Sequence, residues 1–129
     1  MGWSSHGARV GSVLSSRLLD PTREFSQEVG ALEEVFNQRA RLGIMSCLMA
    51  AEELSFLELK EALGLTDGNL SSHLNTLEKR GFIEMKKGYR GRRPHTSVSP
   101  TTAGRRALTK YVSALGDLVS RITANEKQP

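Results

Sequence analysis

A chain of 129 residues with 38% hydrophobic residues can form one domain with a modest core and is hardly long enough for two. Its only cysteine, Cys47, excludes an internal disulfide and a zinc site built from several cysteines of one chain, which fits a reducing cytoplasm. No apolar run approaches membrane-spanning length, and the net charge is +4.

The positive charge is concentrated in one segment. Residues 79–110 contain ten of the 18 Lys and Arg residues and a single acid, Glu84, whereas residues 24–67 contain nine acids and three bases. Basic residues that serve only solubility are normally mixed with acids, so a segment of one sign indicates a surface that binds a polyanion. The segment lacks interleaved bulky apolar residues, which favours nucleic acid over a membrane surface.

Residues 1–30 are expected to form an N-terminal extension that is partly disordered, because the first 19 residues are rich in Ser and Gly and contain no acid. The spacing of Val10, Val13, Leu14 and Leu18 leaves open a short amphipathic helix that packs in a dimer. A transit peptide is a weaker alternative.

A first helix is predicted from about Leu32 to Ala51. Its apolar residues recur at helical spacing, and they are Val35, Phe36, Ile44, Met45, Leu48 and Met49. Cys47 lies in this helix. With no second cysteine and no clustered bases nearby, it is interpreted as a small buried or half-buried thiol rather than a redox sensor.

Two further helices are separated by a short turn. Ser55 and Glu58 have the spacing of a capping box, at the start of a helix over about residues 56–63 that Gly64 ends. Thr66 can cap the helix that follows. A turn of three residues that contains glycine joins two helices at a steep angle, so this segment is predicted to be a helix-turn-helix.

The second helix of this unit has two unlike sides. Leu70, Leu74 and Leu77 form a stripe that faces a core, and Gly81 can close the helix in a left-handed conformation. The other side carries small, mostly uncharged residues, namely Gly68, Asn69, Ser71, Ser72, Asn75 and Thr76, with Lys79 at its end. Short donors and acceptors on an uncluttered helix suit the base edges of a DNA major groove, and an ordinary solvated face is the alternative.

The next segment, FIEMKKGYRGRRPHTSVSP at residues 82–100, predicts two short strands joined by a basic loop whose tip is shaped by Gly91 and Pro94. Three arginines project from this tip: Arg90, Arg92 and Arg93. Their density indicates contact with phosphates or insertion into a minor groove.

A last helix is predicted from Thr101 or Thr102 to about Asn125. Its apolar residues recur without a break and are Leu108, Tyr111, Val112, Leu115, Leu118, Val119 and Ile122. At roughly 35 Å it is longer than a small core can cover. Its far half therefore predicts contact with the same helix of a second subunit, and folding back on its own chain is the alternative.

In this order the elements resemble the winged helix-turn-helix of small prokaryotic transcription regulators, over about residues 32–122. The segment GLTDGNLSSHLNTLEKRGFI resembles the recognition helix and first wing strand of the MarR and ArsR type, and YRGRRPHTSVSPTTAGRRAL resembles their wing and the start of the following helix. The predicted fold is mainly α with a small β-hairpin. It is a winged helix-turn-helix domain at residues 31–125, including a long C-terminal dimerisation helix at 101–125.

The resemblance also carries expectations for single residues. It implies that Gly81 caps the recognition helix and that Gly104 lies where chains pack closely. Pro100 departs from the usual apolar residue, so the second wing strand is expected to end early. Metal-sensing members carry Cys or His/Asp sets that these helices lack. No metal or cofactor is therefore expected, and His73 is interpreted as a packing or helix-capping residue.

The leading interpretation is a cytoplasmic, homodimeric transcriptional regulator that binds specific DNA sequences. The residues expected at DNA are Thr66, Gly68, Asn69, Ser71, Ser72, Asn75, Lys86, Arg90, Arg92 and Arg93. The residues expected between subunits are Leu108, Tyr111, Val112, Leu115, Leu118, Val119 and Ile122. A small-molecule effector is left open as a further partner.

Two other classes of function compete with this interpretation. A winged helix that binds only proteins would be expected to have an acidic or apolar wing, and the arginines argue against it. An enzyme is not expected, because no paired carboxylates, nucleophile-base set or phosphate-binding loop is present.

Overall fold

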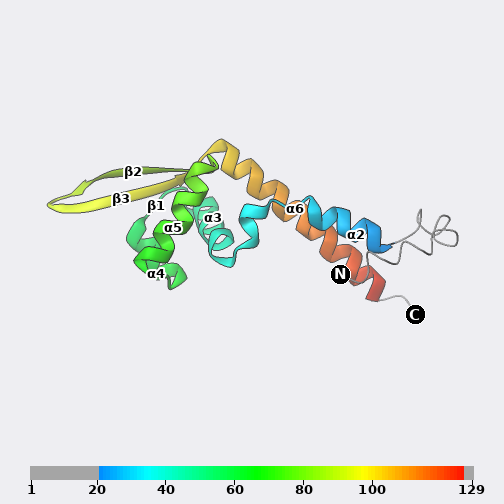
Figure 1. The fold of residues 1–129 in the computed structure, drawn as a ribbon. Coiled ribbons are helices and arrows are strands. Elements are labelled where there is room, and N and C mark those ends of the chain that lie inside the picture. The colour runs from blue at the N-terminus through cyan, green and yellow to red at the C-terminus, as the bar shows by residue number, and fades with distance from the viewer. Residues whose placement is uncertain (1–20, 127–129) are drawn as a thin grey trace.

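The computed structural model describes residues 21–126. Its elements, in chain order, are α2 (Pro21–Gly30), η3 (Glu34–Asn37), α3 (Arg39–Ala51), β1 (Leu54–Ser55), α4 (Phe56–Leu63), α5 (Asp67–Lys79), β2 (Ile83–Arg90), β3 (Arg93–Pro100) and α6 (Thr102–Glu126). Figure 1 shows an elongated molecule. The hairpin β2–β3 extends from one end, and α6 reaches to the other end, where α2 lies along it.

The long helix predicted from Leu32 to Ala51 is divided in two. Residues 34–37 form the 3-10 turn η3, whose start is capped by the Glu33 carboxylate as it accepts a hydrogen bond from Val35 N at 3.1 Å. Gln38 is extended, and α3 begins only at Arg39. The prediction of one continuous helix was wrong because Val35 and Phe36 are buried by this separate turn rather than by the face of α3.

The helix-turn-helix is confirmed with its predicted boundaries. Ser55 and Glu58 form a complete capping box at the start of α4, with hydrogen bonds of 2.8 and 3.0 Å, and Gly64 follows the helix in a left-handed conformation with φ 64°. At the start of α5, Asn69 N donates to the Thr66 hydroxyl at 3.1 Å. Gly81, at φ 76°, turns the chain out of the helix and into β2.

The sheet has three antiparallel strands in the order β1-β3-β2. Strand β1 was not predicted, and it pairs Leu54 with Val98. Both wing strands have eight residues and are longer than predicted. The expected early end of β3 was wrong, since Pro100 pairs with Ile83. A proline is tolerated there because it is the last residue of the strand, beyond the short stretch that β1 covers.

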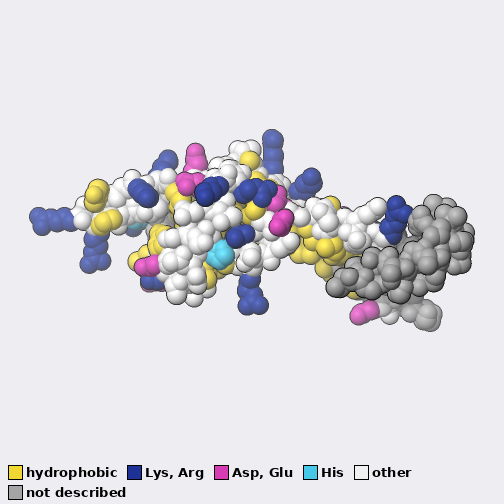
Figure 2. Space-filling model, in the orientation of Figure 1, with side chains coloured by type: hydrophobic (Ala, Val, Ile, Leu, Met, Phe, Trp, Pro, Cys, Tyr) yellow, Lys and Arg dark blue, Asp and Glu magenta, His cyan; other side chains and the backbone are white. Residues whose placement is uncertain are grey.

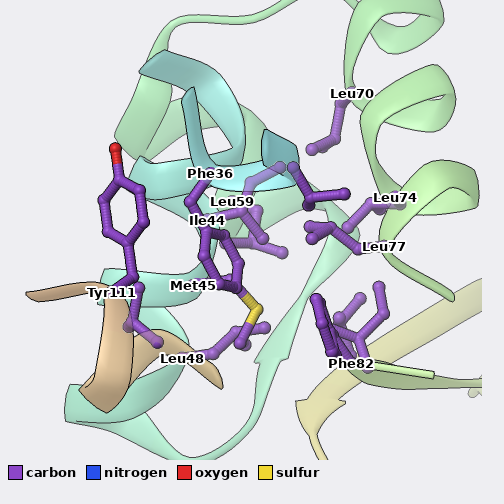
Figure 3. Close-up of a cluster of buried hydrophobic side chains, with 14 residues drawn as sticks. Phe36, Ile44, Met45, Leu48, Leu59, Leu70, Leu74, Leu77, Phe82 and Tyr111 are labelled. Atoms are coloured by element: carbon purple, nitrogen blue, oxygen red, sulfur yellow. The ribbon is translucent and has the colours of Figure 1, made fainter. Parts of the chain in front are cut away.

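The core lies between α3, α4, α5, the base of the hairpin and the first half of α6 (Figure 3). Phe36 stacks on Phe82 and meets Tyr111 edge to face, each pair with ring centroids 5.4 Å apart. The start of α6 also approaches the backbone of Phe82 closely. Gly104 permits this approach, because a Cβ on residue 104 would lie only 2.1 Å from the Phe82 carbonyl oxygen. The predicted close packing at Gly104 is therefore confirmed.

Helix α6 has 25 residues, and only its first half belongs to this core. The Thr101 hydroxyl accepts a hydrogen bond from Gly104 N at 3.0 Å and donates to the Gly81 carbonyl at 2.6 Å, which ties the start of α6 to the end of α5. Further along, Arg121 forms an ion pair of 2.8 Å with Glu28 on α2. No helix within residues 21–126 is long and apolar enough to cross a membrane.

The N-terminal extension is only partly described. Helix α2 lies inside the segment 1–30 and was not predicted. The amphipathic stretch around Val10 to Leu18, which was considered as a packing helix, lies outside the described residues.

Candidate nucleic-acid interface

The outer face of α5 is a row of exposed, short side chains. Its inner face is fixed by three leucines that are at most 1% exposed, namely Leu70, Leu74 and Leu77. All six helix positions predicted at DNA are exposed: Thr66, Gly68, Asn69, Ser71, Ser72 and Asn75. The Thr66 hydroxyl already accepts the capping hydrogen bond from Asn69 N. The side chains of this face that can contact a partner are therefore those of Asn69, Ser71, Ser72 and Asn75.

One flank of α5 and the hairpin enclose a cleft of about 380 Å³. Its lining combines the apolar residues Phe56, Leu74 and Met85 with the polar residues Ser71, Asn75, Lys87 and Thr96. Ser71 and Asn75 therefore stand beside a lysine of the wing. This brings the predicted base-reading helix and the basic hairpin to one surface.

The lysine that lines this cleft is Lys87, and Lys86, the lysine predicted at DNA, does not line it. Side chains alternate along a strand, so Lys87 shares the face of Met85, whereas Lys86 lies on the opposite face, where it pairs with Ser97. Lys87 was not among the residues predicted at DNA. The sequence contained a signal for this position. Met85 is apolar, which indicates that it faces inward, and Lys87, two residues later in the same strand, lies on the same face.

The wing ends in a tight turn that presents three arginines. Arg90 pairs with Arg93, and the two residues between them are Gly91, at φ 67°, and Arg92. A glycine with positive φ at the first position of a two-residue turn is typical of a type II′ hairpin. All three arginines and Lys86 are exposed. Figure 2 shows Lys and Arg side chains projecting from this tip.

His73 occupies the other flank of α5. Its Nδ1 accepts a hydrogen bond of 3.2 Å from Arg41 Nε on α3, which agrees with the predicted packing role. Partial burial, and then the positive charge of Arg41, lower the pKa of His73 below its ordinary value of 6.5. Ser71, Ser72 and His73 point in three directions around the helix, so they do not form a nucleophile-base set.

Within residues 21–126, no three His, Cys, Asp or Glu side chains are grouped so that they could hold a metal ion. Cys47 is half-buried on α3.

The residues predicted between subunits fall into two groups. Leu108 and Tyr111 are buried in the core of their own chain, at 4% and 7% exposed. The outer part of α6 instead exposes Val112, Val119 and Ile122, which are 53%, 55% and 48% exposed, next to the half-buried Leu115 and Leu118. Val29 on α2 is also 53% exposed and was not predicted. In Figure 2, hydrophobic side chains gather where α2 and α6 leave the globular part.

Comparison with known proteins gives a consistent result. Residues 40–119 match a family model described as a winged helix DNA-binding domain. An uncharacterized protein of Methanocaldococcus jannaschii is 39% identical over 89 residues, which are 69% of this chain and 97% of that protein. The transcriptional regulator homologue of Pyrococcus horikoshii OT3 has a similar structure, with 29% identity and a TM-score of 0.69, over 77% of this chain and 97% of that one.

A mutant MarR from E. coli, solved in complex with operator DNA, also has a similar fold. Its TM-score is 0.57 at 20% identity, over 85% of this chain and 84% of that one.

Proposed function

Because the chain belongs to the family of winged helix DNA-binding domains, we propose that it is a transcriptional regulator that binds specific duplex DNA as a homodimer. Helix α5 would enter the major groove, and the wing would contact the backbone or the adjacent minor groove. The observation that carries the proposal is the exposed row of short polar side chains on α5, beside a hairpin with five cationic residues between 86 and 93.

The base-reading side chains in this proposal are Asn69, Ser71, Ser72 and Asn75. Amide and hydroxyl groups can donate to and accept from base edges, and their small size lets the helix backbone approach the groove floor. This face carries no Arg or Gln, which make many of the common bidentate contacts with bases. Direct readout is therefore expected to be modest and partly mediated by water.

The wing would supply affinity rather than sequence preference. Lys86, Lys87 and the three tip arginines are exposed, and Glu84 is the only acid between residues 79 and 110. Cationic side chains that neutralise phosphates release counterions and strengthen binding to any duplex. If an arginine of the tip enters the minor groove, it reads the width of that groove.

The proposed dimer rests on the apolar side chains that the single chain leaves exposed on α6 and α2. Val112, Val119 and Ile122 recur along one side of α6, each about half exposed, and Val29 adds to them from α2. A surface of this kind is expected to be covered in a stable protein. A second copy covers it with the same surface, and two recognition helices then meet successive major grooves about one helical turn apart.

Selection of bound duplexes from a random DNA pool tests this function. The expected result is an enriched site with two half-sites related by two-fold symmetry and spaced by about 10 base pairs. Binding without enrichment would reduce the protein to a non-specific DNA binder. No binding by folded protein at low salt would leave a protein-interaction module as the better interpretation.

A further inference from the structure

A second pocket with two arginines lies beside α5, on the flank away from the wing. Its volume is about 420 Å³, and it is lined by Glu34, Val35, Asn37, Gln38, Arg41 and Arg80. Arg41 comes from the first turn of α3, and Arg80 directly follows α5. Two guanidinium groups from separate elements therefore line one depression in the surface.

Both guanidinium groups are held in place by other residues. Arg41 Nε donates to His73, and Arg80 Nη2 lies 2.7 Å from a carboxylate oxygen of Glu33, with its guanidinium over the ring of Phe82 at 5.3 Å. A guanidinium has five N–H donors, so one bond to the protein leaves several donors for a ligand. Side chains that are already ordered lose less entropy when they bind.

An amide side chain completes the set of donors. Asn37 Oδ1 accepts a hydrogen bond from the Tyr111 hydroxyl at 3.2 Å, which leaves the Asn37 NH₂ group as a donor. Glu34 opposes this set, because its carboxylate also lines the pocket and repels an anion. The pocket therefore combines fixed donors with two carboxylates, Glu33 on Arg80 and Glu34 in the lining, of which Glu34 can be removed without breaking the ion pair that orders Arg80.

The position of the pocket relates it to the wing. Ser71 lines the cleft shared with the hairpin, whereas His73, two residues further on, contacts Arg41. Two residues correspond to about 200° around a helix, so the wing and the pocket lie on opposite flanks of α5. A B-DNA major groove is roughly 12 Å wide and has a phosphate backbone on each side. A helix in that groove would present the wing to one backbone and the pocket to the other.

We propose that this pocket binds a phosphate of the DNA backbone, so that α5 is held by phosphates on both walls of the major groove. The ligand is a phosphodiester oxygen pair, and the donors are Arg41, Arg80 and Asn37. The inference rests on the proposed function, since it assumes that α5 enters the groove.

Two substitutions with opposite expected effects test the pocket. Arg41→Gln removes a positive charge, so affinity should fall on the selected site and on unrelated duplexes alike, and the log-log salt slope should flatten by about 0.9 for each phosphate that is no longer neutralised, or twice that for a dimer. Glu34→Gln removes the opposing carboxylate, so binding should tighten. Arg23→Gln is the control, because Arg23 is exposed on α2, and α2 lies at the end of the molecule opposite the hairpin (Figure 1).

Arg41→Lys separates phosphate binding from the positioning of His73. It keeps the charge and loses the Nε donor, so it should retain most of the affinity and the salt slope. If Arg41→Lys fails as Arg41→Gln does, the arginine acts through His73 and the phosphate site is refuted. Circular dichroism and thermal melting establish that each variant is folded.

Replacement of single phosphates by uncharged methylphosphonates locates the contact. Replacing one phosphate on the wall opposite the wing should lower the affinity of wild-type protein and leave the affinity of Arg41→Gln unchanged. For Arg93→Ala, the phosphate whose replacement no longer lowers the affinity should be a different one. If no phosphate is coupled to Arg41, or the same one is coupled to both arginines, the inference is wrong. Competition by inorganic phosphate at constant ionic strength, absent in Arg41→Gln, would indicate a free anion as the occupant instead.

The outcomes distinguish failure of the proposed function from failure of the pocket. If wild-type protein binds no duplex, the proposed function fails and the inference fails with it. If wild-type and Arg23→Gln bind equally and Arg41→Gln has the same affinity and slope, only the phosphate pocket is refuted.

Discussion

At the scale of single residues, the side chains expected to read sequence differ from those expected to hold phosphates. Ser72 is exposed on α5, and Asn75, also exposed, lines the cleft at the wing. Neither carries a charge. Their removal should therefore affect the preferred site and leave binding to other duplexes nearly unchanged.

Ser72→Ala and Asn75→Ala test this distinction. Each should weaken binding to the selected site by roughly 1 to 3 kcal/mol, the value of a direct base contact, with the salt slope unchanged. Anisotropy titrations on the selected site and on a scrambled duplex measure both quantities. Equal weakening on the two duplexes would contradict a base-reading role.

His73 gives a prediction for the dependence of stability on pH. Its pKa in the folded chain is lowered by burial and by Arg41, so the unfolded chain binds the proton more readily. The free energy of unfolding should therefore decrease as the pH falls through 6.5, the ordinary value, and this loss should end below the lowered folded pKa.

His73→Gln is the matching variant, because glutamine keeps an acceptor for Arg41 Nε and does not titrate. Denaturant titrations between about pH 7.5 and pH 5 should show a weaker pH dependence for this variant than for wild type. The same pH dependence in both proteins would show that His73 is not the titrating group.

At the scale of elements, the contact between α6 and the start of β2 depends on the missing side chain of Gly104. A Cβ there would lie 2.1 Å from the Phe82 carbonyl oxygen, and backbone cannot give way as a flexible side chain can. The positions of α6 and of the hairpin are therefore coupled at one residue. Any side chain at 104 must push the two elements apart.

Gly104→Ala should destabilise the fold by about 1 to 3 kcal/mol or more through overpacking. Gly68→Ala is the control, because a Cβ at 68 has no heavy atom within 4 Å among the described residues. The control should be neutral or stabilising by up to about 1 kcal/mol, since alanine favours a helix over glycine. Chemical denaturation compares the two, and a larger loss of stability in Gly68→Ala would contradict the role given to Gly104.

The elements that were correctly predicted carry their signals locally. The capping box of Ser55 and Glu58, Gly64 and the leucine period of α5 determined the helix-turn-helix without reference to the rest of the chain. Two errors depend on distant contacts. The break at Gln38 arises because Phe36 turns toward Phe82 and Tyr111, and β1 is defined only by pairing with Val98. Neither contact leaves a periodic pattern in its own segment.

In the candidate site, too, features set by the local sequence were predictable and features set by contacts between distant segments were not. Exposure of the polar row on α5 was predictable, because the leucines fix which side is buried. The position of Lys87 beside Ser71, and of Arg41 beside His73, depends on how the hairpin and α3 pack against α5. Those arrangements were not predicted from the sequence.

At the scale of the whole molecule, the globular part and the far half of α6 have different surfaces. Lys and Arg side chains project near the hairpin, and a hydrophobic patch lies where α2 and α6 leave the globular part (Figure 2). Val112, Val119 and Ile122 are the exposed apolar residues of α6. The proposed homodimer assigns each surface a different partner, DNA for the first and a second copy for the other. Dimer formation should therefore be separable from folding.

Val119→Asp tests the dimer, because Val119 is 55% exposed in the single chain and the change should not disturb the core. It would place an unpaired charge in the proposed interface and should yield folded monomer. Leu115→Asp and Leu118→Asp should separate the subunits as well. Ser120→Asp is the control, being exposed on another side of α6. Sedimentation that shows only monomer for wild type at micromolar concentration, with and without DNA, would contradict the homodimer.

DNA binding itself is tested by titrating duplex DNA at low salt with wild-type protein and with the double variant Arg92→Ala, Arg93→Ala. Wild type should saturate the duplex, and its log-log salt slope should exceed that of the variant by about 0.9 for each phosphate that the two arginines neutralise, doubled in a dimer. Folded wild-type protein that binds no duplex under these conditions would contradict the proposal that this chain acts on DNA.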